Sequence, residues 1–204
     1  MFTTHYIVWI VLSILVSMTC HEAMHAYVAH TLGDTTAKDE GRLTLNPLKH
    51  IDLIATVMLP VILLLLGLPP IFVAKPVPFD PRNVRYGDYG AALVGIAGPF
   101  TNLALAYIGS LLIRFFASDD MLISVFTIFT QVNIAFFVFN MIPLPPLDGS
   151  RLLYAFAPEP LQELMQQLER TGSLVIILVL VLLLPGFSNL LINLNNDIFT
   201  FLLR

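Results

Sequence analysis

The sequence contains little charge for its length. Asp, Glu, Lys and Arg make up 12% of its 204 residues, whereas soluble domains average about 25%. Hydrophobic residues make up 57%, and the mean hydropathy is +0.83. A soluble fold of this size could not hide that much apolar surface, because a large part of any protein surface stays exposed after folding. The composition therefore predicts a protein embedded in lipid, long enough for about five or six spans of roughly 20 residues.

Two further absences exclude classes of function. The ten Lys and Arg residues are scattered and the net charge is −4, which excludes a nucleic-acid binder that works by neutralising phosphates. Cys20 is the single cysteine, which excludes an intrachain disulfide and a metal cluster held by cysteines alone. The length leaves no room for a folded soluble domain beside the spans. We therefore expect one integral-membrane domain over residues 1–204.

Long apolar runs predict the helices of a membrane bundle. The predicted transmembrane helices are Tyr6–His30, Tyr89–Phe116, Met121–Ile142 and a last one from Ser173 through Leu184 into the following residues. Leu53–Ala74 is also apolar, but three prolines and a glycine interrupt it. Irregular backbone at membrane depth is tolerated only where protein or a wet cavity covers it. We therefore expect Leu53–Pro78 to be a re-entrant element that dips into the membrane and returns.

The polar segments predict two smaller elements. Between Gly41 and Pro47, polar and apolar residues alternate, which predicts a short strand or β-hairpin at Arg42–Asn46. Pro160–Arg170 has the pattern of an amphipathic surface helix. The predicted fold is therefore an all-α, polytopic membrane bundle with a short strand and a re-entrant element.

The first apolar run carries a group of ionisable residues, His21-Glu22-Ala23-Met24-His25. Helical residues four apart share a face, so His21 and His25 can present two imidazoles to one cation. Glu22 lies one position on, where a general base can take a proton from metal-bound water. Zinc suits this arrangement, because two imidazoles and one carboxylate leave a fourth position open for water. A chance string is an unsatisfactory reading, since unpaired ionisable side chains are expensive in an apolar span.

A third ligand is needed, and Asp148 is a candidate. It follows the Met121–Ile142 run after a proline-rich bend, and Gly149 allows a tight turn behind it. Asp is also common at helix N-caps. On spacing alone, a ligand and a capping residue explain Asp148 equally well.

Several motifs in order give the chain a family resemblance. They are His21 to His25, Gly98-Pro99-x-x-Asn102, Asn140-x-x-Pro143-x-Pro145-x-Leu147-Asp148-Gly149, the segment Gly41 to Pro47, and Ala74-Lys75-Pro76-Val77-Pro78. With these motifs the chain resembles the site-2 protease family of intramembrane zinc metalloproteases, in its small prokaryotic branch. The resemblance covers nearly the whole chain. Many members carry a PDZ or CBS regulatory domain, for which we expect no room here.

The resemblance implies a set of roles. His21, His25 and Asp148 would hold one zinc ion per chain, and Glu22 would be the catalytic acid and base. Asn102 and Asn140 would face the active site and contact the substrate backbone or the developing oxyanion. The substrates would be single-span or previously cleaved membrane proteins, cut in or near their transmembrane segments.

The ligands also constrain the path of the chain. His25 lies near the carboxyl end of its helix and Asp148 just beyond the end of another, so both ends must lie toward one membrane face. The chain between them must then cross an even number of times, which again favours re-entry of Leu53–Pro78. On this path one face collects most of the basic residues, namely Lys38, Arg42, Lys49, Lys75, Arg82, Arg85, Arg151 and Arg170. The other face has Arg114 and Arg204, so the bias predicts an active site on the cytoplasmic side of a prokaryotic cell membrane.

Two other classes of function remain to be weighed. An inactive homologue that captures partner helices would keep the fold, but it would be free to lose the four site residues. A metal transporter would use the same side chains as a transit site, usually between inverted repeats, and the sequence shows no such repeat. The predicted function is therefore that of a membrane zinc endopeptidase.

Overall fold

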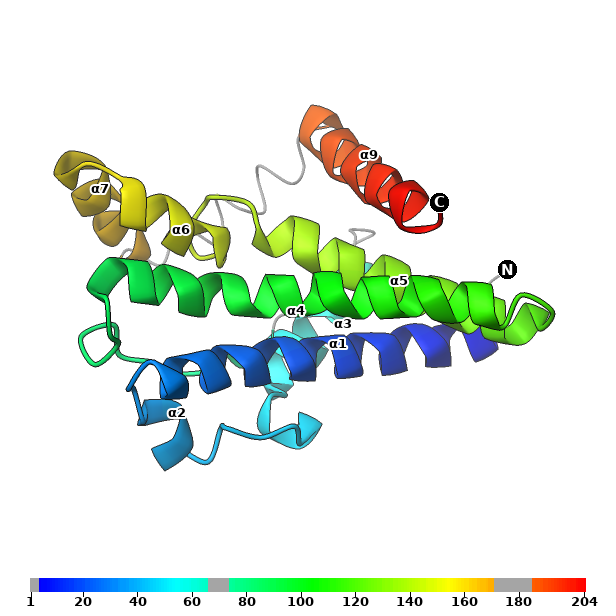
Figure 1. Ribbon diagram of the computed structural model, residues 1–204, viewed down its shortest axis with the longest axis horizontal. Coiled ribbons are helices and arrows are strands. Elements are labelled where there is room, and N and C mark those ends of the chain that lie inside the picture. The colour runs from blue at the N-terminus through cyan, green and yellow to red at the C-terminus, as the bar shows by residue number, and fades with distance from the viewer. Residues whose placement is uncertain (1–3, 66–73, 171–184) are drawn as a thin grey trace.

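Three long helices form the centre of the molecule. The computed structural model describes residues 4–65, 74–170 and 185–204. The long helices are α1 (Thr4–Thr31), α4 (Gly87–Phe115) and α5 (Asp120–Asn140), and they lie side by side in Figure 1. All three are long and apolar enough to cross a membrane. They confirm the three predicted spans that fall on described residues.

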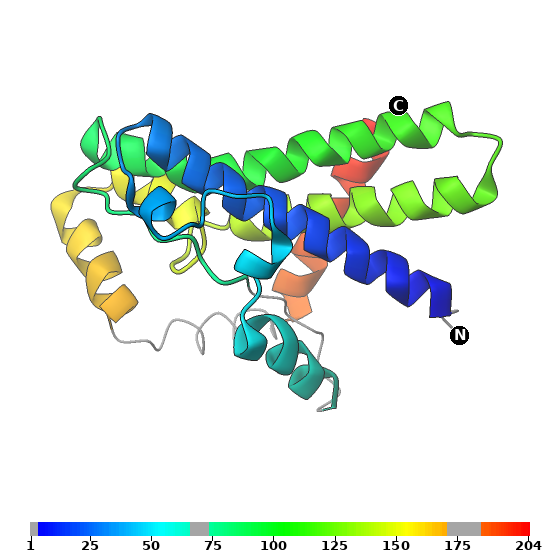
Figure 2. The same cartoon turned by 90° about the horizontal axis from the view of Figure 1, so that it is seen from below.

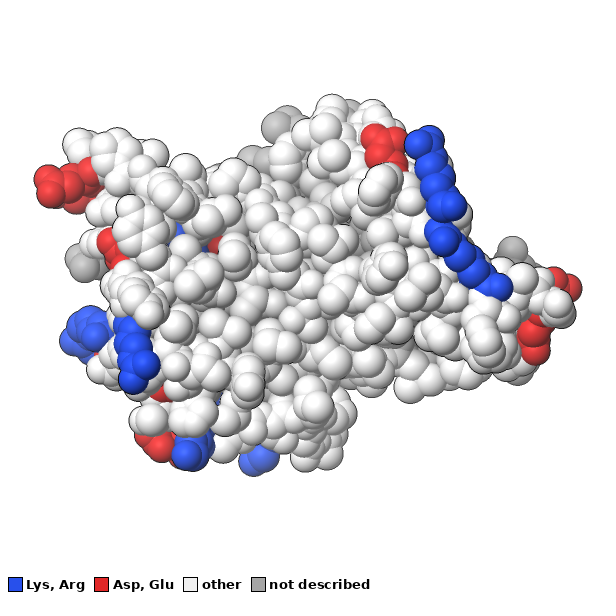
Figure 3. Space-filling model, viewed as in Figure 1, with Lys and Arg blue, Asp and Glu red and all other residues white. Residues whose placement is uncertain are grey.

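The surface of this bundle is apolar along its middle and charged toward its ends, as a lipid environment requires. Exposed apolar side chains run along the outer face of α1, including Ile7, Val11 and Val16. On the face drawn in Figure 3, charged side chains gather toward the two ends of the long axis, and the middle is almost free of them. Since no water reaches a bilayer core, charges belong at the ends of spanning helices. The chain is therefore a multi-pass membrane protein.

Helix α4 is the central helix because its small residues allow close packing. It contacts α1, α5 and α6 (Gly149–Phe156). Its buried positions are mostly small residues: Gly90, Ala91, Ala92, Gly95, Gly98, Ala106, Gly109 and Ser110. Small side chains let helix backbones approach closely, and this close van der Waals packing holds helices together in lipid, where the hydrophobic effect does not favour their association. At Gly109, a Cβ atom would lie 2.4 Å from the Thr130 hydroxyl of α5.

The direction of each helix follows from the chain path. Helices α1 and α5 end at the same end of the bundle, where α4 begins, and both termini of the chain lie toward the other end (Figure 1). Helix α9 (Pro185–Leu202) packs against α5. The Arg114 guanidinium donates to the Leu202 carbonyl across 2.7 Å, so α9 ends beside the end of α4. The predicted meeting of the carboxyl ends of the first and third spans is confirmed.

The segment expected to be re-entrant leaves the bundle and returns to its starting point. The short helix η1 (Pro47–Lys49), the π-helical turn η2 (Leu53–Met58) and α3 (Leu59–Leu65) lead the chain away, and Figure 2 shows α3 pointing out from the bundle. The Lys75 N–H then donates to the His50 carbonyl at 2.9 Å. The two ends of the segment therefore lie at one level, which a single crossing of the membrane could not achieve.

Two smaller predictions had different outcomes. The amphipathic helix is confirmed as α7 (Glu159–Arg170). The predicted strand or β-hairpin at Arg42–Asn46 is not confirmed, since residues 41–46 form a turn, a bend and irregular backbone, and the described residues contain no strand. A strand needs an extended partner for its hydrogen bonds, whereas the neighbouring elements here are η1 and the short helix α2 (Thr36–Asp39). The predicted span at Ser173–Leu184 lies outside the described residues.

Candidate metal centre

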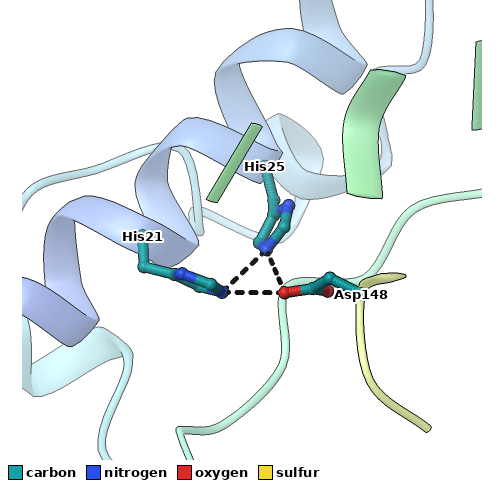
Figure 4. A group of neighbouring side chains, drawn as sticks. All are labelled: His21, His25 and Asp148. Carbon is teal, nitrogen blue, oxygen red and sulfur yellow. Dashed lines mark hydrogen bonds and ion pairs between the residues drawn. The ribbon is translucent and has the colours of Figure 1, made fainter. Parts of the chain in front are cut away.

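Three predicted ligand side chains meet between α1 and the loop that follows α5. His21 Nε2 lies 3.0 Å from His25 Nε2 and 3.0 Å from Asp148 Oδ2, and His25 Nε2 lies 3.4 Å from that same oxygen. Figure 4 shows the two rings and the carboxylate pointing toward one another. His21 and Asp148 are 127 residues apart in the chain. The fold therefore brings residues of two distant motifs to one point.

The spacing and surroundings of these atoms fit a small metal ion. Tetrahedral bonds of about 2.0–2.2 Å place ligand atoms about 3.3–3.6 Å apart, close to the 3.0–3.4 Å seen between the three atoms. Room for them depends on Gly98 of α4, where a Cβ atom would lie 2.4 Å from His25 Nε2. It would also lie 2.7 Å from His21 Nε2. His21, His25 and Asp148 can therefore hold one metal ion.

Hydrogen bonds on the far side of each imidazole orient both rings. His25 Nδ1 lies 2.7 Å from the Val94 carbonyl of α4, and His21 Nδ1 lies 2.6 Å from Asn102 Oδ1. A carbonyl oxygen only accepts, so Nδ1 of His25 donates and its Nε2 keeps the lone pair. This is the outer arrangement typical of metal-ligating histidines.

The position of Asp148 decides between its two interpretations. It stands immediately before α6, at the N-cap position, but its side chain makes no capping hydrogen bond. The carboxylate points to the two imidazoles instead (Figure 4). Gly149 permits this tight turn, because a Cβ atom there would lie 2.5 Å from the Met141 carbonyl oxygen. The geometry favours the ligand interpretation over the cap.

Glu22 is held next to the ligand group by a segment far along the chain. Its side chain is buried, and Oε2 accepts a hydrogen bond from the Val77 N–H at 2.9 Å. Arg42, also buried, donates to the Lys75 carbonyl at 2.6 Å and to the Pro76 carbonyl at 3.4 Å. The Arg42 guanidinium thus fixes the backbone that presents Val77 to Glu22. Neither Arg42 nor Val77 is foreseen as a site residue from the sequence, although both lie in the motifs that carry the resemblance.

The structure places the two predicted asparagines in different surroundings. Asn102 is fully buried, and its Nδ2 donates to Asn133 Oδ1 at 3.0 Å and to the Ser17 carbonyl at 3.2 Å. Its amide hydrogens are therefore engaged inside the bundle, and its predicted contact with substrate stays a prediction. Asn140 is partly buried and donates to the Phe136 carbonyl at 3.0 Å. Its predicted contact with substrate stays a prediction.

A buried carboxylate ties together the loops at this end of the bundle. Asp34, after α1, accepts hydrogen bonds from the Thr36 hydroxyl at 2.6 Å, the Thr36 N–H at 3.1 Å and the Asp80 N–H at 2.9 Å. Burial by itself raises the pKa of Asp34, but the hydrogen bonds from Thr36, Asp80 and Asn83 outweigh it and hold that pKa below its ordinary value of 3.8. Asp34 therefore connects the end of α1 to the chain that leads into α4.

Comparison with known proteins gives a consistent set of relatives. The family described as Peptidase family M50 matches residues 116–184. The chain is 38% identical over 182 residues to "Putative zinc metalloprotease YwhC" of Bacillus subtilis, a match that covers 85% of this chain and 80% of that protein. It is 28% identical over 174 residues to "Putative zinc metalloprotease Rip2" of Mycolicibacterium smegmatis, covering 82% of this chain and 64% of that protein. The Mycobacterium tuberculosis protein of the same name is 29% identical over 186 residues, covering 86% and 66%. No solved structure is significantly similar to the chain.

The family and the geometry agree with each other. The relatives are named as zinc metalloproteases, and the chain brings two imidazoles and a carboxylate together as such an enzyme requires. The match to the Bacillus protein covers most of both chains. This chain therefore belongs to peptidase family M50, the site-2 protease family of metalloproteases.

Proposed function

We propose that this protein is an intramembrane zinc endopeptidase, one domain over residues 1–204, that cuts peptide bonds in or near transmembrane segments of other membrane proteins. The observation that carries the proposal is the meeting of His21, His25 and Asp148 beside Glu22, within a bundle of three apolar helices. A site at this place reaches peptide bonds that soluble proteases do not.

The three ligand residues and Glu22 divide the work. His21, His25 and Asp148 hold one zinc ion, which when bound lowers the pKa of water and polarises a carbonyl. Glu22 accepts the proton of the attacking water and passes it to the leaving amine. Its Oε2 is engaged by Val77, so Oε1 is the atom available for that proton. Asn140 is our candidate for a donor to the oxyanion.

Substrates of this site must present an unwound backbone. Peptide carbonyls inside a helix are hydrogen-bonded and shielded, so helix-weakening residues in a client's membrane segment should mark the region that is cut. Single-span proteins, or membrane stubs left by an earlier cut, fit this site best.

The orientation in the membrane follows from charge. Most Lys and Arg residues lie in segments that flank the site end, whereas Arg114 and Arg204 lie in segments at the opposite end. Cytoplasmic loops carry the excess of basic residues. We therefore propose a prokaryotic cell membrane with the site facing the cytoplasm. Reporter fusions in the loop after α2 and in the turn between α4 and α5 should report opposite sides.

The test of the proposed function is Glu22→Gln in purified enzyme reconstituted with a single-span reporter protein. We expect zinc content to stay at that of the unchanged protein while cleavage falls by more than about 100-fold, because the substitution removes the general base. Glu40→Gln is the matched control, since Glu40 is exposed after α2. Cleavage that survives Glu22→Gln with zinc retained would contradict the mechanism. Zinc bound without any cleavage by the unchanged protein would favour a helix-binding homologue.

A further inference from the structure

A line of buried amides runs from the metal centre into the bundle. His21 Nδ1 lies 2.6 Å from Asn102 Oδ1 of α4, and Asn102 Nδ2 lies 3.0 Å from Asn133 Oδ1 of α5. Asn133 Nδ2 in turn lies 2.9 Å from the Phe129 carbonyl oxygen. Both asparagines are fully buried. The line therefore joins all three long helices without access to water.

The direction of every hydrogen bond in this line is fixed by carbonyl groups. The Phe129 carbonyl can only accept, so Asn133 must turn its Nδ2 toward it and its Oδ1 toward Asn102. Asn102 then faces two acceptors, Asn133 Oδ1 and the Ser17 carbonyl. Its Nδ2 must point to both of them, and its Oδ1 is left facing His21. The orientation of each amide thus follows from its acceptors.

The end of this line determines which nitrogen of His21 carries the proton. Asn102 Oδ1 accepts, so Nδ1 of His21 must be the protonated nitrogen, and Nε2 keeps its lone pair toward Asp148 and His25. We propose that Asn133 is a positioning residue of the metal centre, which acts through Asn102 to keep His21 Nε2 available as a ligand. This inference rests on the proposed function, because it assumes that the centre holds a metal.

Burial is what makes the line effective. If Asn102 turned over, its Oδ1 would face two oxygen atoms and its Nδ2 would face the His21 ring. No water could compensate, and each buried polar group left without a partner destabilises that orientation. In the absence of the Asn133 acceptor, only the Ser17 carbonyl at 3.2 Å still opposes that turn.

The test is zinc affinity, measured by competition with a chromogenic chelator on the full-length protein in detergent. Changing a group that orients a metal-ligating histidine typically lowers metal affinity 10- to 100-fold. We expect zinc affinity to fall about 10- to 100-fold in Asn102→Leu and about 3- to 10-fold in Asn133→Leu. Leucine is similar in size to asparagine but lacks the amide. In the Asn102→Leu background, Asn133→Leu should have no further effect, because residues that act through a shared partner are not additive.

Two further variants separate positioning from a general loosening of α5. Asn133→Asp, which a fully buried position holds in its neutral form, donates its O–H to the Phe129 carbonyl and keeps an acceptor opposite Asn102. It should stay within about threefold of the unchanged protein in zinc affinity, since the orienting contact remains. Thr130→Val is the matched control, because Thr130 is fully buried one turn earlier on α5, outside the line of amides. The zinc affinity of this variant should equal that of the unchanged protein. Asn133→Asp also tests the proposal if Asn133→Leu does not fold.

The outcomes distinguish the inference from the function on which it rests. An unchanged protein that binds no zinc overturns both. An unchanged protein that binds zinc, together with Asn133→Leu at full affinity, overturns the inference and leaves the protease proposal standing. Equal losses from Asn133→Leu and Thr130→Val, or additive losses in the double variant, also overturn it.

Discussion

Gly98→Ala should greatly weaken metal binding while the bundle stays intact. The new Cβ atom would lie 2.4 Å from His25 Nε2 and 2.7 Å from His21 Nε2. Non-bonded atoms of this kind need about 3.5 Å, so the rings must retreat by about 1 Å, whereas a metal site tolerates errors of about 0.2 Å. Alanine is also about 1 kcal/mol more favourable than glycine inside a helix. Helix α4 itself therefore loses nothing by the change.

The assay compares zinc content and zinc affinity of Gly98→Ala with those of the unchanged protein in the same detergent. We expect an affinity loss of at least about 100-fold, beyond what loss of a histidine-orienting group costs. Gly186→Ala is the matched control, because a Cβ atom there, in α9, meets nothing within 4 Å. A Gly98→Ala protein that binds zinc within threefold of the unchanged protein would refute the assignment of the centre to this place.

Three other substitutions test the surroundings of the centre. Asp148→Ala should leave less than about a tenth of the bound zinc, because two ligands alone hold the ion weakly. The same change at the exposed Asp88 is the control. If Asp148→Ala retained its zinc, Asp148 would not be a ligand of the centre. Arg42→Gln should lower kcat roughly 10- to 100-fold with zinc content unchanged, since misplacing a catalytic group by about 1 Å has this cost; the same change at the exposed Arg82 should have no effect. Asp34→Asn should lower the melting temperature at neutral pH by about 4–8 °C, from about 2 kcal/mol of lost hydrogen bonds to a charged group. Folding lowers the pKa of Asp34, so its carboxylate stabilises the protein above pH 3.8 and loses that effect as the pH falls through the lower pKa of the folded state. If the difference in melting temperature between Asp34→Asn and the unchanged protein did not shrink in acid, this explanation would be contradicted.

The sequence was most informative where chemistry and membrane burial coincide. His21 and His25 lie one helical turn apart, so their meeting follows from local geometry alone. The three described spans follow from long apolar runs. The expectation that Asp148 joins the histidines needed the family resemblance, because its distance along the chain says nothing about its place in space.

The remaining features depend on contacts between distant segments. Asn102 belongs to a motif, but only the packing of α1 against α4 and α5 shows that its amide lies against His21. Asn133 lies in an ordinary apolar run, and polar residues in such runs usually join helices. The strand predicted at Arg42–Asn46 is not confirmed for the same reason, since alternation along a chain does not supply the partner that a strand requires.

The long separation between His21 and Asp148 has a consequence for biosynthesis. The ribosome makes both histidines early, and the carboxylate emerges 127 residues later, after about 6–25 s at ordinary elongation rates. Until α5 has entered the bilayer and the loop behind it has folded back, the centre is incomplete. A half-made chain therefore cannot attack the nascent membrane proteins that are inserted beside it.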